Sequence, residues 1–596
     1  MESNQMKLLR EKMREHDVHA LIIPTSDFHD TEYVCDYFSA RRHFSGFTGS
    51  AGVLVVLDDQ AGVWTDGRYF IQAAKELEGS GIDLMKMGEK DTPTIKDYIL
   101  DHLAQHQRVA FDGRCVSMTD FEMYQNAFKT KDLEIVTDLD LAGEAWPDRP
   151  ALPNSKTFHY DEKYTGMSIA DKLVAVREAM KKEGAKYHVL SKIDEVAWLY
   201  NLRAHDIPSF PVALAYSILD DQDYGVLYID GSRLDDQSRE LLTQNGIEIK
   251  GYHDIYADVE TLDGSVLMDK SFINSRIGRA IQQPIWSVDP VQLLKAKKNP
   301  VEVEGFYETH RRDAVAMIQF WKWLEEEMNA GHTVTEIDAR NHLHHLRSLQ
   351  PEFVEDSFTT ISAYGANASM PHYHPDEAHP VVIEPRGLYL LDSGGHYLTG
   401  TTDITRTFVV GELTDEEREA FTLVLQGHIH LSRAVFPKGA CGLNLDIEAR
   451  QPLWKKGLDF NHGTGHGVGC LLSVHEGPNG IRWRIVPERR DSAPLEVGMV
   501  TSNEPGVYVE GKFGIRHENL IVTKPYCSTE SHDFLCHDPL TLVPFDVRGL
   551  DLNIMTDDEI EWLNAYHKRV YDTISPRLTQ EEAEWLKNKT APISKA

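Results

Sequence analysis

Four carboxylates and one imidazole stand among glycines and threonines in the second half of the chain. They are Asp392 in DSGG, Asp403 in TTDITRT, His466 in HGTGHGVG, Glu504 in NEPG and Glu518 in IRHEN. Carboxylate oxygens dominate this set and no thiol takes part, which favours a pair of hard or borderline divalent ions over a structural zinc. Two ions that share carboxylates can polarise a carbonyl and acidify a water, which is the chemistry of metal-assisted hydrolysis.

The segments around the first two acids predict a β-hairpin. Residues 388–395 and 401–410 are runs of apolar and β-branched side chains, separated by a glycine-containing turn. Asp392 and Asp403 should therefore approach each other across neighbouring strands. One acid beside a glycine is ordinary turn chemistry, but four acids and a histidine together in this context favour a site.

A second hairpin is predicted over residues 499–509 and 513–522, which are also joined by a glycine-containing turn. This hairpin would bring Glu504 toward Glu518. Each hairpin would then supply two carboxylates, with the glycine-flanked histidine between them. The sequence thus predicts a dinuclear metal cage built on strands.

Long motifs in this region resemble one enzyme family. GLYLLDSGGHYLTGTTDITRTF (387–408) and HGTGHGVGCLLSVHEGPNGI (462–481) are similar to the pita-bread metallopeptidases, most of all to their aminopeptidase P branch. FSGFTGSAGVLVVLDDQAGVWTDGRYFIQAAKEL (44–77) is similar to the long, three-domain, cytosolic type of that branch. The resemblance covers nearly the whole chain. It implies an Xaa-Pro aminopeptidase, which releases the first residue of peptides that have proline in second position.

The resemblance also implies the roles of the five residues. They would hold two divalent ions, Mn²⁺ first, with Co²⁺ or Zn²⁺ as alternatives, and Asp403 and Glu518 would bridge the pair. A hydroxide activated by the two ions would attack the scissile carbonyl. Glu504 would be both a ligand and the general base.

Three further histidines match family positions that line the catalytic centre and contact the substrate: His372 in MPHYHP, His462 in HGTGHG and His475 in VHEGP. His475 and His372 would donate hydrogen bonds to the scissile carbonyl or its oxyanion, and His462 would position the substrate. His374 is not a motif position.

Arg516 matches the arginine that stands beside the last ligand in the family. Because side chains alternate along a strand, Arg516 should share a face with Glu518 and orient its carboxylate, while His517 points the opposite way. His517 departs from the pattern, since relatives often have an aliphatic residue there. Facing away from the metals, it should not alter the chemistry.

An internal repeat divides the first half of the chain. EKMREHDVHALII (11–23) is similar to EAMKKEGAKYHVL (178–190), and each reads as an amphipathic helix followed by an apolar strand. LDDQAGVWTDG (57–67) is echoed by LDDQDYGVLYIDG (219–231). A repeat this long implies two related α/β domains rather than a solenoid.

Two linkers complete the predicted domain organisation. The Pro-rich stretch 145–155 and the segment 295–304, which leads into a long helical pattern, mark the boundaries. We therefore expect domains at 1–150, 151–297 and 298–596. By resemblance these are two creatinase-like α/β domains and a pita-bread catalytic domain of α+β type with a helical C-terminal extension.

Composition limits the classes of partner. A chain of 596 residues exceeds one core, so several domains are expected. Its apolar content of 41% and charged content of 26% are typical of a soluble globular protein, and its net charge of −33 argues against binding nucleic acid. The expected partners are peptides with penultimate proline and, by resemblance, a second copy in a homodimer.

Targeting signals are also informative. The N-terminus lacks the apolar region of a signal peptide, and no run approaches the roughly 18–20 apolar residues of a membrane span. The six cysteines show no CxxC motif or framework spacing. A cytoplasmic protein with no membrane contact is the prediction.

Other functions remain as alternatives. A proline dipeptidase would share every motif, because the choice between dipeptides and longer peptides depends on how the N-terminal domains close the pocket. A metal-free peptide-binding module or a creatinase-like hydrolase is disfavoured by the intact ligand set. Nucleotide loops, a GxSxG nucleophile and an HExxH zinc motif are absent from the sequence.

Overall fold

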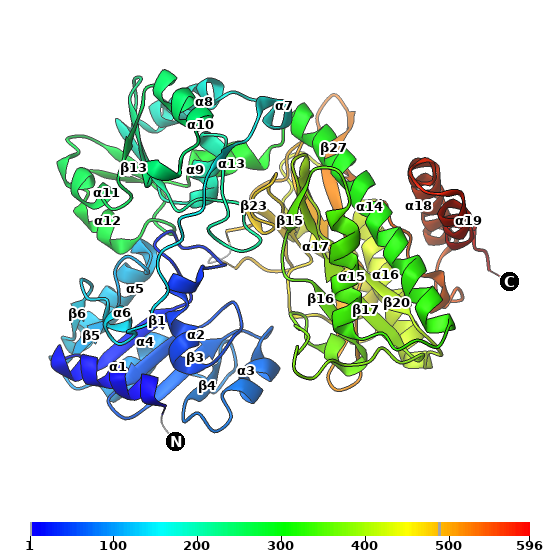
Figure 1. Ribbon diagram of the computed structural model, residues 1–596, viewed down its shortest axis with the longest axis horizontal. Coiled ribbons are helices and arrows are strands. Elements are labelled where there is room, and N and C mark those ends of the chain that lie inside the picture. The colour runs from blue at the N-terminus through cyan, green and yellow to red at the C-terminus, as the bar shows by residue number, and fades with distance from the viewer. Residues whose placement is uncertain (1–2, 487–489, 596) are drawn as a thin grey trace. The chain divides into compact units, whose positions relative to one another are not determined.

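A computed structural model describes residues 3–486 and 490–595 of the chain (Figure 1). The chain divides into two compact units. The first comprises Met1–Glu162 with Met167–Gln292, and the second comprises Lys163–Gly166 with Leu293–Ala596. All of the metal ligands expected from the sequence lie in the second unit.

The first N-terminal domain is built on a mixed six-stranded sheet covered by helices. Its strands, in spatial order, are β4 (Asp83–Lys86), β3 (Ala61–Thr65), β2 (Val53–Leu57), β1 (Ala20–Pro24), β5 (Arg108–Ala110) and β6 (Glu134–Val136). Helix α1 (Asn4–Glu15) begins at Ser3, whose hydroxyl accepts from the Met6 amide. Met6, Leu9 and Met13 form the apolar face that α1 buries in the core of this domain.

The second N-terminal domain has the same strand order. Its strands are β12 (Ile247–Lys250), β11 (Gly225–Tyr228), β10 (Tyr216–Asp220), β8 (Tyr187–Leu190), β13 (Val266–Met268) and β14 (Pro284–Trp286). Parallel and antiparallel pairings also follow the same sequence from edge to edge in both sheets. Helix α8 (Ile169–Glu183) precedes β8 as α1 precedes β1. The predicted repeat of two related α/β domains is confirmed.

The second unit contains antiparallel sheets. A three-stranded sheet has the order β16 (Ile361–Tyr364), β17 (Leu388–Ser393), β20 (Ile404–Val409). A six-stranded sheet has the order β21 (Val435–Pro437), β28 (Asp533–Pro539), β27 (Asn519–Ser528), β24 (Val500–Asn503), β22 (Gly465–Gly467), β23 (Glu476–Ile481). Strands β25 (Gly506–Val509) and β26 (Phe513–Arg516) form a separate hairpin.

Long helices cover these sheets. They are α14 (Pro300–Asn329), α15 (Glu336–Ser348), α16 (Asp415–Ser432) and α17 (Gly442–Trp454). Figure 1 shows α14 and α15 running over β16, β17 and β20. Trp321 of α14 packs against Phe408 of β20 in the shared core. Helix α14 begins where the sequence predicts, because Asn299 and Glu302 form a reciprocal capping box around Pro300.

The chain ends in the two helices expected from the sequence, α18 (Asp557–Ile574) and α19 (Gln580–Lys589). Thr556 and Thr579 cap them, each in a capping box with the glutamate three residues on. The predicted class, α/β N-terminal domains followed by an α+β catalytic domain, is confirmed. Within the residues described, no helix combines the length and apolar character needed to cross a bilayer.

Candidate metal centre

The first predicted hairpin places Asp392 and Asp403 at one end of the three-stranded sheet. Strands β17 and β20 pair antiparallel, with Asp392 opposite Thr405. Asp403 directly precedes β20. Both side chains are buried. The predicted pairing of these two segments is therefore confirmed.

The second predicted hairpin has the expected pairing in two parts. Strand β24 pairs with β27, and β25 pairs with β26 across the turn at Gly511. Glu504 follows β24 directly, and Glu518 stands between β26 and β27. The register Asn503 opposite Asn519 brings these two glutamates to the same end of the strands.

His466 joins the acids from β22. Its Nε2 lies 3.5 Å from Asp403 Oδ2 and 3.5 Å from Glu504 Oε1. One ligand atom each from Asp403, His466 and Glu518 lie within 4.8 Å of one another. These three side chains therefore converge closely enough to share a cation.

In the described part of the chain, the four carboxylates share one paired guanidinium, that of Arg516. Burial and the neighbouring carboxylates raise the pKa of Asp403 and of Glu518 well above their ordinary values. Burial raises the pKa of Glu504 to about 7. Asp392 Oδ1 is buried and accepts no hydrogen bond from the residues described. Divalent cations would relieve the repulsion among these buried acids and would use the lone pair that Asp392 leaves free. The residues therefore fit a metal site.

Arg516, which is itself buried, supplies one positive charge to this group. Its Nη2 donates to Asp392 Oδ2 at 2.5 Å, and its Nε donates to Thr405 Oγ1 at 3.1 Å. Thr405 Oγ1 donates in turn to Glu518 Oε2 at 2.7 Å. Arg516 thus orients Asp392 directly and reaches Glu518 through Thr405, on the face that strand alternation predicts.

Tyr508 contacts two of the predicted site residues, although no motif marks it. His462 Nε2 lies 2.8 Å from the Tyr508 hydroxyl, which also accepts from Arg516 Nη1 at 2.5 Å. Burial and then the charge of Arg516 hold the pKa of His462 well below its ordinary value, so the ring is neutral. The signal was available, because Tyr508 is opposite Gly514 in the predicted hairpin and therefore diagonal to Arg516.

Three further histidines, His475, His372 and His374, differ in their contacts and burial. The rings of His475 and His466 meet edge to face with centroids 4.3 Å apart. His372 is half-buried and follows Pro371, whose carbonyl accepts from Arg516 Nη2 at 3.4 Å. His374 is exposed, in keeping with its lack of a motif role.

His517 faces away from the acids, as the alternation of the strand predicts. Its ring is fully buried and packs edge to face against Phe421 and Phe545, with centroids 4.4 Å and 5.6 Å away. Burial and then the charge of Arg406 keep its pKa well below the ordinary value. His517 is therefore a neutral core side chain.

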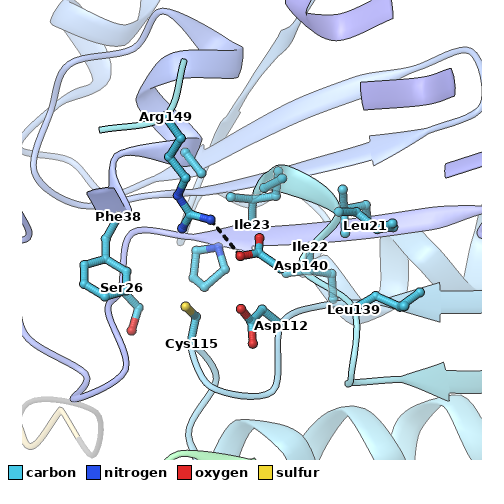
Figure 2. A pocket seen from close by; sticks show the side chains of 14 residues that line it. Leu21, Ile22, Ile23, Ser26, Phe38, Asp112, Cys115, Leu139, Asp140 and Arg149 are labelled. Atoms are coloured by element: carbon cyan, nitrogen blue, oxygen red, sulfur yellow. Dashed lines mark hydrogen bonds and ion pairs between the residues drawn. The ribbon is translucent and has the colours of Figure 1, made fainter. Parts of the chain in front are cut away.

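A separate pocket lies in the first N-terminal domain, beside β1 (Figure 2). Its two acidic lining residues are already paired. Asp112 binds Arg114 at 2.7 Å, and Asp140 binds Arg149 at 2.7 Å. With its acids neutralised by arginines, this pocket lacks the electrostatics of a metal site, in contrast to the acids of the second unit.

Comparison with known protein families matches most of the chain. Residues 304–525 match metallopeptidase family M24, and residues 533–593 match the C-terminal region of peptidase M24. Residues 5–140 and 148–302 each match the creatinase/prolidase N-terminal domain. The chain belongs to metallopeptidase family M24.

Full-length M24 relatives agree with the aminopeptidase P resemblance. A probable Xaa-Pro aminopeptidase P of Laccaria bicolor is 38% identical over 99% of this chain and 94% of its own. Aminopeptidase P2 of Arabidopsis thaliana is 38% identical over 97% of this chain and 86% of its own. The crystal structure of an X-prolyl aminopeptidase from Caenorhabditis elegans, described as a cytosolic enzyme with a di-nuclear active site, superposes with a TM-score of 0.94 at 35% identity, covering 99% of both chains.

Removing metal from this M24 protein is expected to make its stability fall as pH rises. Glu504 has a pKa of about 7 in the folded state against an ordinary 4.5, so the folded state binds that proton more tightly. The free energy of unfolding that this tighter proton binding adds is fully present below about pH 4.5. It is lost by about pH 7, at up to about 1.4 kcal/mol for each pH unit. Thermal unfolding between pH 5 and 8, with chelator and with added Mn²⁺, should show a metal-induced gain that grows with pH. A metal-induced gain in stability that does not change with pH would contradict the proposal that the cation relieves repulsion among these acids.

Proposed function

We propose that the protein is a metal-dependent Xaa-Pro aminopeptidase. The observation that carries this proposal is the convergence of Asp403, His466 and Glu518 in a buried pocket whose acids have raised pKa values. Full-length relatives named Xaa-Pro aminopeptidase P support the substrate class.

Five residues would hold two divalent cations: Asp392, Asp403, His466, Glu504 and Glu518. We propose Mn²⁺ as the cation, with Co²⁺ or Zn²⁺ as alternatives, because the donors are mainly carboxylates. When bound, the cations would polarise the scissile carbonyl and lower the pKa of the attacking water. The relative with a di-nuclear active site supports the number two.

The side chains around the acids divide the remaining work. Glu504 would accept the proton of the attacking water and deliver it to the leaving proline nitrogen. His475, whose ring lies beside His466, would donate to the carbonyl oxygen as negative charge develops there. His372 would donate to the same oxygen, and His462, held neutral by burial and by Arg516, would position the substrate.

Proline in second position is compatible with this arrangement. An X-Pro bond has no N–H to donate to an enzyme. The groups assigned here act on the carbonyl oxygen and on the leaving nitrogen, and none of them requires that missing donor. The free α-amino group of the substrate would meet the acidic pocket.

Cleavage of two matched substrates tests the function. The purified protein should cleave an Xaa-Pro-Xaa tripeptide at the first bond, lose this activity with chelator and regain it with Mn²⁺. Faster cleavage of an Xaa-Pro dipeptide would instead identify a proline dipeptidase. Tight peptide binding with no cleavage at any metal concentration would identify a binding module.

We also propose that the enzyme is a cytoplasmic homodimer. Leu443, Ile447 and Trp454 are exposed by 37%, 39% and 40% and fall on one face of α17, an apolar stripe that a second copy would cover. All six cysteines lie in the described part of the chain and are unbridged thiols, which suits a reducing compartment. The mass of the protein in solution, measured by light scattering, tests the dimer.

A further inference from the structure

Two lysines and one glutamate form a buried ionic cluster that the assigned chemistry does not use. Lys298 Nζ lies 2.5 Å from Glu476 Oε1, and Lys295 Nζ lies 3.0 Å from Glu476 Oε2. The three side chains are only 2%, 1% and 1% exposed, for Lys298, Lys295 and Glu476. We call Lys295, Lys298 and Glu476 the lysine–glutamate cluster.

The lysines come from the segment that leads into the catalytic domain. Lys295 lies in the last turn of α13 (Pro290–Ala296), and Lys298 directly precedes the N-cap of α14. The Lys298 amide donates to the Gly498 carbonyl at 3.2 Å, just before β24, the strand that Glu504 follows directly. The cluster thus ties this segment to the strands that carry the candidate site.

Glu476 is the neighbour of His475. The ring of His475, in the bend just before β23, lies against His466, whereas the carboxylate of Glu476, the first residue of β23, contacts the two lysines. The Ser473 hydroxyl donates to the His475 carbonyl at 2.8 Å. The backbone at His475 is therefore fixed on one side by Ser473 and on the other by the Glu476 carboxylate.

The loop between the two histidines closes around Glu476. Gly467 pairs with Glu476 where β22 meets β23, and a Cβ at Gly467 would lie 2.2 Å from the Glu476 carbonyl oxygen. A Cβ at Gly469 would lie 2.8 Å from Glu476 Oε2. Only glycine permits this approach, so the position of the Glu476 carboxylate and the path from His466 to His475 depend on each other.

Burying three charges is costly unless each remains paired. A stabilising core could use apolar side chains here, so an ionic cluster at this place calls for a role beyond stability. A carboxylate held by two ammonium groups has a defined direction, which an apolar contact lacks. That direction is transmitted to the next residue, His475.

We propose that the lysine–glutamate cluster is a positioning device that fixes His475 against the carbonyl oxygen of the substrate. This inference rests on the proposed function, in which His475 donates to that oxygen. Lys295, Lys298 and Glu476 are positioning residues, since none of them contacts the reacting atoms.

The first variant is Lys298→Met, which leaves Lys295 and Glu476 as a balanced buried pair. We expect kcat for an Xaa-Pro-Xaa peptide to fall roughly tenfold, since small misplacements of a catalytic group are costly, while KM and bound metal stay unchanged. The matched control is Lys297→Met. Lys297 pairs with Glu496 at 3.0 Å, but both side chains are 36% exposed, so kcat should not change.

A readout that does not depend on activity is amide hydrogen exchange in the metal-free protein. Residues 467–476 should exchange faster in Lys298→Met than in the unmodified protein, because the loop around Glu476 is less constrained. Lys297→Met should leave their exchange unchanged. Equal protection in all three proteins would overturn the inference.

A double-mutant cycle with His475→Ala decides whether the cluster acts through that histidine. His475→Ala alone should lower kcat roughly 10²–10³-fold, and adding Lys298→Met should lower it no further. If the two substitutions lower kcat by the product of their separate factors, the cluster has only a structural role. That result would overturn the inference and leave the proposed function standing. Unchanged kcat in His475→Ala would instead refute the proposed role of His475 and with it the inference. If the unmodified protein shows no metal-dependent cleavage of the peptide, the proposed function itself is refuted.

Discussion

Replacing Asp403 by alanine is expected to abolish measurable turnover and stable metal binding. Asp403 is buried, lies 3.5 Å from His466 and is one of the three residues whose ligand atoms converge within 4.8 Å. Bound metal would stabilise the charge of the transition state by several kcal/mol. Losing that stabilisation corresponds to a fall in kcat of roughly 10³-fold or more. Cleavage of an Xaa-Pro-Xaa peptide and metal analysis of the purified variant measure the two effects.

The isosteric variant Asp403→Asn separates metal binding from folding. Because burial and nearby carboxylates raise the pKa of Asp403, removing its charge should stabilise the metal-free protein at neutral pH. Added Mn²⁺ should then stabilise the variant less than the unmodified protein. Asp558→Ala, at an exposed position in the first turn of α18, is the control and should behave like the unmodified protein. An Asp403→Ala protein that retains two ions and full activity would exclude Asp403 as a ligand.

The strands that adjoin the acids could be predicted because their pairing depends on local periodicity. An alternation of side chains and a short turn determine a hairpin's register within one residue, since a slip would turn every side chain to the wrong face. The pairing of β17 with β20 and of β24 with β27 agrees with that periodicity, whereas the registers, Asp392 opposite Thr405 and Asn503 opposite Asn519, are known from the structure. The N-cap threonines and Asn299 likewise determined where the helices begin.

The approach of His475 to His466 could not be predicted in the same way. The register shifts between His466 and Gly467, where β22 meets β23, and a loop of irregular structure connects the two strands. Neither feature leaves a periodic pattern. Motif resemblance named His475, but only the structure shows that its ring stands against His466.

Long-range pairing was also beyond the sequence. Lys298 and Glu476 are 178 positions apart, and the pair has no local signal, because a lysine in a charged segment is most often a solvated side chain. Tyr508 is the opposite case. Its diagonal relation to Arg516 follows from the pairing within the predicted hairpin, so the sequence does carry a signal for this contact.

Replacing Glu504 by glutamine is expected to lower kcat roughly 10²–10⁴-fold, the range for loss of a general base. Glutamine keeps the shape and a carbonyl oxygen but cannot accept the proton of the attacking water. Burial raises the pKa of Glu504 to about 7 before any cation is bound, and bound cations would lower it. Metal content measured beside kcat distinguishes the lost base from a lost ligand.

The pH profile gives the sharper test of this role. A carboxylate acts as a base only when ionised, so kcat/KM of the unmodified enzyme should rise with pH up to the pKa of Glu504 and then level off. In Glu504→Gln the residual rate should lose this acid limb, because the titrating group is gone. Glu510→Gln is the matched control, since Glu510 lies exposed at the turn of the β25–β26 hairpin and should keep both the rate and the limb. An unchanged acid limb in Glu504→Gln would assign the titration to another group, and Glu504 would then be a ligand alone.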